Sequence, residues 1–223
     1  NDKCTRPGEP IDPVSGAVVD EHVDHEASGP FLFRWGRSYS SADADREGSV
    51  GRGFRHTYER TLEVDLDRVV YTDEEGKEVC FFGLGPDREE AAREGYRLRR
   101  RIGREETIYE ISRPGEPMME FVRPHRAGAA PRFSRLIAGE ARAELLRDDS
   151  GRLAGMLETS AGGAIETRLV HDDRGRVIEV RRGPRGERTL PRVVAYAYDH
   201  AGCLVAWEDA LGSRGSYRYD AAH

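Results

Sequence analysis

The chain has 223 residues, and its 41 acidic side chains outnumber its 35 lysines and arginines, which gives a formal net charge of −6. That balance argues against a nucleic-acid-binding protein, because such proteins normally carry a strongly basic surface. The length is enough for one large domain or two small ones, and a hydrophobic content of 37% argues against wholesale disorder.

The first third of the chain predicts strands. In residues 30–41 the aromatic side chains fall at even spacing, which is typical of a half-buried strand: Phe31, Phe33, Trp35 and Tyr39. A glycine-rich turn, GSVGRGF, follows. A second strand is expected over residues 58–66, with these side chains on one face: Tyr58, Leu62, Val64 and Leu66.

The middle of the chain continues this pattern with one exception. Residues 88–95, REEAAREG, are the best helical candidate of the first half, although the segment is short and ends at a glycine. Residues 96–104, YRLRRRIGR, are interpreted as a strand with solvated arginines, and a polyanion site is the alternative. ETIYEIS and PMMEFVRP, residues 106–112 and 117–124, indicate further strands. Because no amphipathic helix of three turns appears, the expected fold class is all-β with antiparallel strands.

A four-residue pattern returns in the second half of the chain. Aspartate and glycine stand three residues apart in each complete copy: Asp148 and Gly151, Asp172 and Gly175, Asp199 and Gly202. Asp220 starts a fourth copy, and Asp73 with Gly76 forms an earlier relative. The steps between successive aspartates from Asp148 to Asp220 are 24, 27 and 21 residues.

This spacing has a physical reason. An aspartate at the first position accepts hydrogen bonds from backbone N–H groups just ahead of it. A glycine at the fourth position takes a positive φ without steric cost, which fits a type I turn closed by a G1 bulge. Each unit is therefore predicted to be a strand, a tight turn and a strand. A single hairpin of this size is marginal in water, so neighbouring units must pair edge to edge into a winding sheet.

Two copies, YAYDHAGCLVAW and YRYD, resemble the tyrosine-aspartate (YD) repeats of Rhs proteins, which teneurins and the C component of insecticidal Tc toxins share. Residues 11–65 resemble the segment that opens the repeat core of bacterial Rhs polymorphic toxins. The matching features are Asp12-Pro13 with Gly16, Arg34 and Arg37 with Tyr39-Ser40-Ser41, and Gly51 and Gly53-Phe54 with Tyr58.

The resemblance divides the chain into an opening segment, residues 1–66, and a β-hairpin and YD-repeat region, residues 67–223, whose array the chain end cuts off. We expect residues 11–66 and 140–223 to belong to one continuous sheet, because both show period-two patterning and no long Ser- or Gly-rich linker separates them.

The resemblance also implies a function. Rhs cores are hollow β shells that enclose the toxic C-terminal segment of the same polypeptide, and type VI secretion commonly delivers them with an adaptor or spike protein. This chain would then be the first portion of the shell, cytoplasmic before export by a non-Sec route. Its partners would be the remainder of the shell and the enclosed toxin. The alternative is a carbohydrate-binding or cell-surface adhesion module built from the same repeats.

Few residues suggest catalysis or ligand binding. His22 and His25, in HVDH, could bind a metal with Asp24, but on an extended chain the two imidazoles would point to opposite faces. His56 could act as a base, yet no Gly-x-Ser-x-Gly elbow or Cys/His pairing accompanies it. Adjacent glutamates are more typical of solvated charge than of glycosidase carboxylates; these pairs are Glu74-Glu75, Glu89-Glu90 and Glu105-Glu106. Trp35 and Trp207 could form a sugar-binding platform, but aromatic strand residues are more typical of a core. We therefore expect a protein that is not an enzyme and needs no cofactor or metal.

The three cysteines are Cys4, Cys80 and Cys203, and their positions indicate neither a zinc site nor a disulfide framework. No apolar run approaches the roughly 20 residues of a membrane span, and the polar start NDKCTRPGEPIDP does not resemble a signal peptide. We expect no membrane span and no nucleic-acid partner.

Overall fold

The computed structural model describes residues 11, 16–29, 31–85 and 89–219. The fold is all-β and antiparallel, as the sequence predicts. Twelve strands form one open sheet in which every strand pairs with its neighbours in the sequence. Its strands are β9 Glu90–Arg93, β10 Tyr96–Ile102, β11 Glu106–Ser112, β12 Met118–Pro124, β13 Arg132–Ala138, β14 Ala141–Arg147, β15 Leu153–Ser160, β16 Gly163–His171, β17 Val177–Pro184, β18 Arg192–Tyr198, β19 Leu204–Asp209 and β20 Arg214–Ser216.

The described strands between Val19 and Phe82 form smaller sheets. The opening sheet has the order β1-β2-β5, a two-stranded sheet pairs β3 with β4, and a third sheet has the order β6-β7-β8. A single 3-10 turn, Ser41–Asp43, is the helical structure within the described residues. The strands are β1 Val19–Ala27, β2 Phe33–Ser40, β3 Glu47–Gly48, β4 Gly51–Arg52, β5 Phe54–His56, β6 Thr61–Val64, β7 Arg68–Thr72 and β8 Glu78–Phe82.

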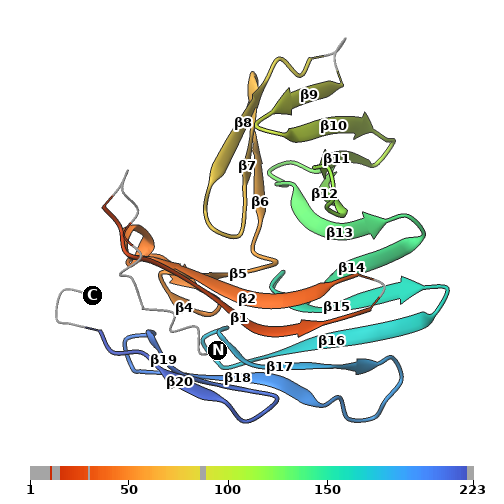
Figure 1. The fold of residues 1–223 in the computed structure, drawn as a ribbon. Helices are drawn as coiled ribbons and strands as arrows, with labels where there is room; N and C mark the ends of the chain where they lie inside the picture. Colours follow the sequence, from red (N-terminus) through yellow and green to blue (C-terminus); the bar gives the residue numbers. More distant parts are fainter. Residues whose placement is uncertain (1–10, 12–15, 30, 86–88, 220–223) are drawn as a thin grey trace, which may run out of the picture.

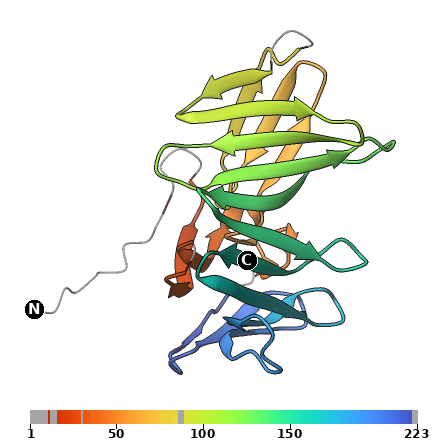
Figure 2. The same cartoon turned by 90° about the vertical axis from the view of Figure 1, so that its right-hand side faces the viewer.

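The small sheets cover one face of the twelve-stranded sheet and create two cores. Phe33 and Trp35 of the opening sheet pack in a cluster with side chains from β14 to β19. Tyr71 and Phe81 of the third sheet pack in a second cluster with side chains from β9 to β14. Figure 1 shows β1 and β2 crossing the molecule below β6–β13 and above β17–β20, and Figure 2, turned by 90°, shows the strands of the long sheet one above another.

The expectation of one continuous sheet is therefore wrong. Residues 19–56 and 141–216 are both β, but they belong to different sheets that meet face to face. The period-two pattern correctly predicts which side chains are buried, but it does not specify whether a strand pairs edge to edge or packs across a core. The division at residue 66 falls in the turn between β6 and β7, and it stays a prediction.

Two local predictions are also wrong. The proposed helix at residues 88–95 is strand β9 from Glu90 to Arg93, which pairs with β10 through a two-residue turn. Glu94 and Gly95 of this turn have φ of 50° and 82°, so the chain reverses where a helix would continue. Leu66 does not extend a strand: β6 ends at Val64, and Leu66 lies fully exposed in the turn before β7. At residues 88–95, strand pairing overrides the helix propensity of a short segment.

The basic segment that includes β10 is a strand with exposed arginines. Tyr96 and Leu98 point into the core, while Arg97 and Arg99 are exposed. Arg101 forms ion pairs with Glu110 and Glu120. Acidic neighbours thus oppose part of the positive charge, which favours the solvated strand over a polyanion site here.

Two further findings concern the cysteines and the membrane. Cys80 is partly buried and Cys203 is buried, and Cys4 lies outside the described residues. Within the described part of the chain, no helix combines the length and the apolar character needed to cross a membrane.

Candidate functional site

The Asp-x-x-Gly windows form the turns of the hairpins. At Asp172, the Gly175 N–H donates to the Asp172 carbonyl at 3.0 Å and the Asp172 N–H donates to the Arg176 carbonyl at 2.9 Å. Asp172 Oδ1 accepts from the N–H groups of Arg174 and Arg176 at 3.0 and 2.8 Å. The strand pairing shifts register just before the turn, between Val170 and His171. These are the features of a type I turn closed by a G1 bulge.

The other windows repeat this geometry. Gly76, Gly151, Gly175 and Gly202 have φ of 85°, 86°, 81° and 90°, and each donates its N–H to the carbonyl of the aspartate three residues earlier: Asp73, Asp148, Asp172 and Asp199. Asp220 lies outside the described residues. A further turn of this kind, at Asp209, is not among the turns predicted from the sequence. The Asp209 carbonyl accepts from the Gly212 N–H at 3.2 Å, and Gly212 has a φ of 82°. The same spacing, in DALG, could have identified it, but it follows Asp199 by only ten residues because it closes the next hairpin.

Arginines that follow the turn glycines connect one turn to the next. Arg176 Nε donates to Asp172 Oδ2 of its own turn at 2.8 Å, and its Nη1 reaches the Asp199 carbonyl of the next turn at 3.5 Å. Burial would raise the pKa of Asp172, but the hydrogen bonds from Arg176 outweigh it and lower the pKa below its ordinary value. The turns at Asp148, Asp172 and Asp199 therefore lie in a row at one edge of the twelve-stranded sheet.

We expect Gly175→Val to lower the free energy of unfolding by about 1–3 kcal/mol, because a β-branched residue is strained at φ 81°. An added Cβ would also lie 2.6 Å from Arg152 Nη1. Gly162 is the control: its φ is not in the left-handed region, and its nearest neighbour is Ser160 Oγ at 3.6 Å. Chemical denaturation should show a clearly smaller loss for Gly162→Val, and equal losses would contradict the structural role of the turn.

A buried ion pair of the opening sheet also contacts the twelve-stranded sheet. Arg37 Nε and Nη2 donate to the two oxygens of Asp24 at 2.6 and 2.7 Å, and both side chains are 0% exposed. Asp24 also accepts from the hydroxyl of Tyr196, 172 residues away, at 2.5 Å. That hydroxyl accepts from Trp35 Nε1 at 2.7 Å. The charges are thus satisfied by side chains from β1, β2 and β18.

Aromatic rings surround this guanidinium. The Arg37 Cζ atom lies 5.3 to 5.8 Å from the ring centroids of Phe54, Tyr196, Trp207 and Tyr217. Burial would lower the pKa of Arg37, but the hydrogen bonds and charge of Asp24 outweigh it and raise the pKa above its ordinary value. Arg37 stays charged, and its cation–π contacts add to the ion pair.

A β-bulge positions Asp24. The register of β1 with β2 shifts between Val23 and His25, so Asp24 is the extra residue and turns inward. His22 and His25 consequently pair with Arg37 and Trp35, which share the buried face of β2. The expectation that the two imidazoles point to opposite faces is wrong, because it assumes a regular strand.

Neither imidazole belongs to a metal site within the described residues, where no group of three His, Cys, Asp or Glu side chains is arranged to hold a metal ion. His22 lies against Trp207, with ring centroids 4.5 Å apart, and His25 lies 6.0 Å from Phe33. Both rings pack against aromatic side chains at the contact between the sheets.

A second buried ion pair lies on the twelve-stranded sheet, where that sheet faces the opening sheet. Arg182 on β17 donates to Glu158 on β15 at 2.5 and 3.1 Å, and the side chains are 5% and 1% exposed. Arg182 also donates to Thr167 Oγ1 at 3.0 Å, and its Cζ lies 4.0 Å from the Phe33 ring centroid. Both ion pairs thus touch β2, although sequence reasoning identified neither.

His56 is a buried strand residue that stacks on Trp35, with ring centroids 4.8 Å apart. Its Nδ1 accepts from the Tyr58 N–H at 3.1 Å. Burial, with the positive charges of Arg46 and Arg147 and the neighbouring His171, lowers the pKa of His56 to about 3. The ring is therefore neutral at pH 7.

This pKa predicts acid sensitivity. The unfolded chain binds a proton at His56 near pH 6.5, while the folded chain does not until about pH 3. The stabilisation is therefore complete above pH 6.5 and is lost as the pH falls towards 3. Between pH 6.5 and 5 we expect a loss of about 2 kcal/mol from this group. Denaturation curves at several pH values should show a shallower pH dependence for His56→Gln, and parallel slopes would contradict it.

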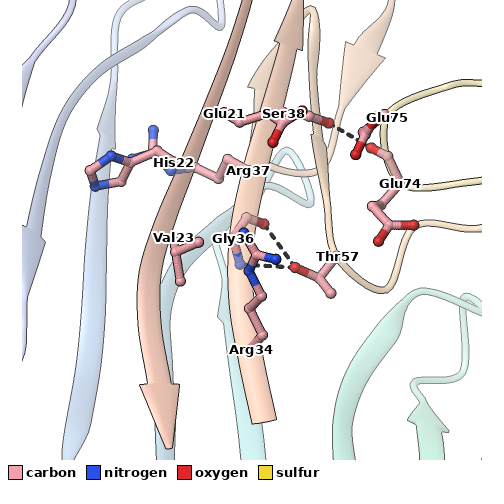
Figure 3. Close-up of a pocket in the computed structure, with 10 residues that line it drawn as sticks. All are labelled: Glu21, His22, Val23, Arg34, Gly36, Arg37, Ser38, Thr57, Glu74 and Glu75. Carbon is pink, nitrogen blue, oxygen red and sulfur yellow. Dashed lines mark hydrogen bonds between the residues drawn. The ribbon is translucent and has the colours of Figure 1, made fainter. Parts of the chain in front are cut away.

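A small cleft lies between β1, β2 and the turn at Asp73 (Figure 3). Ser38 Oγ donates to the Glu74 carbonyl at 2.5 Å, and Gly36 N–H donates to Thr57 Oγ1 at 2.9 Å. Burial, with the charges of Glu21, Asp73 and Glu74, raises the pKa of Glu75. The volume of about 60 Å³ is far below the roughly 300–1,000 Å³ of ligand pockets.

The three acidic pairs lie in different surroundings. Glu74 binds Arg60 at 2.6 Å. Glu89 and Glu105 are exposed, and Glu106 starts β11, where it pairs with Pro124.

Comparison with protein families gives one match. Residues 8–81, about a third of the chain, match a family described as a domain of unknown function (DUF6531). The match spans the opening sheet and most of the β6-β7-β8 sheet, and therefore includes Asp24 and Arg37 but not their partner Tyr196. No curated protein matches the chain.

Proposed function

We propose that the chain is a structural segment of an Rhs-type β shell that encloses and delivers a C-terminal toxic domain. The observation that carries the proposal is the contact between the sheets: residues resembling the opening of an Rhs core bind, through Asp24 and Arg37, to a sheet of Asp-x-x-Gly hairpins. A wall made of such a sheet needs its first strands fixed on one face, because each hairpin alone is marginal.

The partners follow from this proposal. They are the remainder of the shell and its enclosed toxin, with a type VI spike or adaptor protein at the start of the core. The protein would be cytoplasmic before export and would leave the cell without a Sec signal. The proposed role is not enzymatic and needs no cofactor.

The carbohydrate-binding alternative has less support. Trp35 is 1% exposed, and Trp207 contacts His22 on one side and Gly215 on another. Neither ring offers the open face that sugar stacking requires, so no observation favours this alternative over the shell.

Limited proteolysis of the natural gene product that contains these residues tests the proposal. If the shell encloses a cargo, a segment beyond residue 223 should resist protease in the native state and be cut after denaturation. Equal digestion in both states, or a gene product that ends at residue 223, would contradict it.

A further inference from the structure

One cavity between the small sheets and the twelve-stranded sheet carries an unbalanced positive charge. It has a volume of about 330 Å³ and lies between β5–β6 and the turns that follow β14 and β16. Its apolar wall includes Tyr58, Phe133, Leu153 and Leu169. The volume is at the lower end of the range of small-molecule sites.

Four arginines and one glutamate line this cavity, and three of these charges are balanced. Glu59 binds Arg46, Arg60 binds Glu74 at 2.6 Å, and Arg152 binds Asp148 at 2.9 Å. Arg132 and Arg147 remain. Neither has a carboxylate within ion-pair distance among the described residues; Arg147 donates instead to the carbonyls of Phe133 and Gly151, at 2.9 and 3.2 Å.

These two arginines lie side by side on neighbouring strands. Both guanidinium groups lie at Gly151: Arg147 Nη1 donates to its carbonyl at 3.2 Å, and a Cβ at this glycine would lie 3.3 Å from Arg132 Nη1. Like charges in that arrangement are destabilising unless a counter-ion lies between them. Burial, followed by the charge of Arg132, lowers the pKa of Arg147. Burial and Arg152 lower the pKa of His171, which faces the same cavity.

We propose that this cavity is a binding site for a phosphate group, held between Arg132 and Arg147. Two uncompensated guanidinium groups match a doubly negative oxyanion, and each can donate two parallel N–H groups to its oxygens. The neutral His56 and the apolar wall would accommodate the organic part of a small phosphomonoester. This site is independent of the proposed shell, since it depends only on side chains within the chain.

Isothermal titration of the full chain with inorganic phosphate, and separately with phenyl phosphate, tests the proposal. Saturable binding is expected, weakened at least about tenfold by Arg147→Gln and by Arg132→Gln. Arg142→Gln is the matched control, because Arg142 is on β14, is exposed and does not line the cavity. Tighter binding of phenyl phosphate would show that the apolar wall contacts the organic part of the ligand. Equal affinity for the two compounds would show that the site recognises the phosphate group alone.

Thermal melting distinguishes specific phosphate binding from ionic screening and from misfolding of the variants. Phosphate should raise the melting temperature of the wild type more than sodium chloride of equal ionic strength does. Without phosphate, Arg132→Gln should melt no lower than the wild type, because it removes a repulsion while the hydrogen bonds of Arg147 to Phe133 and Gly151 remain. Equal effects of the two salts, unchanged binding by the arginine variants, or equal weakening by Arg142→Gln would overturn the proposal.

Discussion

Replacing Arg37 with methionine is expected to lower the free energy of unfolding by about 3–5 kcal/mol, because Asp24 then remains as an uncompensated buried charge. The side chains of both residues are 0% exposed, so water cannot replace the guanidinium. Methionine retains much of the apolar volume, which limits the contribution of a cavity. Urea denaturation, followed by tryptophan fluorescence and by circular dichroism, measures the loss.

A control and a double variant make this test specific. Arg34 lies on the same strand but is exposed, so Arg34→Met should change stability by no more than about 0.5 kcal/mol. Adding Asp24→Asn to Arg37→Met should recover part of the loss, because the buried charge is gone. Similar losses for Arg34→Met and Arg37→Met would show that the ion pair does not hold the sheets together.

Arg182→Met should have an effect of similar size, about 3–5 kcal/mol, since it leaves the Glu158 carboxylate buried without its partner. The Glu158 side chain is 1% exposed. The variant also removes the contact of the guanidinium with the Phe33 ring, 4.0 Å away. We therefore expect strand β2 to lose protection from hydrogen exchange together with β15 and β17, as measured by mass spectrometry.

Arg181 is the neighbouring control on the same strand. It pairs with Glu179, and the two side chains are 36% and 25% exposed. Exposed pairs contribute little, so Arg181→Met should cost less than about 1 kcal/mol. If Arg182→Met and Arg181→Met unfold at the same denaturant concentration, the second ion pair does not stabilise the contact between the sheets.

Sequence patterns predict the local structure of this chain well where a short spacing specifies it. The even spacing of Phe33 and Trp35 identifies β2 and its buried face. The three-residue spacing of Asp172 and Gly175 identifies a turn, because the hydrogen bonds involved are local. The helical candidate fails although Glu, Ala and Arg favour helices, because so short a helix is marginal and the pairing of β9 with β10 decides the conformation.

The contact between the sheets could not be predicted in this way. Asp24 and Tyr196 are 172 residues apart, and no periodicity relates them. Asp24 turns inward only because of a bulge, which shifts the faces of His22 and His25 as well. Arg37 belongs to the features that resemble an Rhs opening segment, but its charge gave no reason to expect burial.

The central claim is that this sheet forms the wall of a shell, with the opening sheet bound to one of its faces. Electron cryo-microscopy of the natural gene product tests it most directly. The account predicts that strands β9 to β20 continue into a hollow wall around a further segment of the chain, with the Asp24–Arg37 pair buried between β1, β2 and β18. A gene product without an enclosed cavity, or one in which residues 19–56 lie apart from β18, would contradict the account.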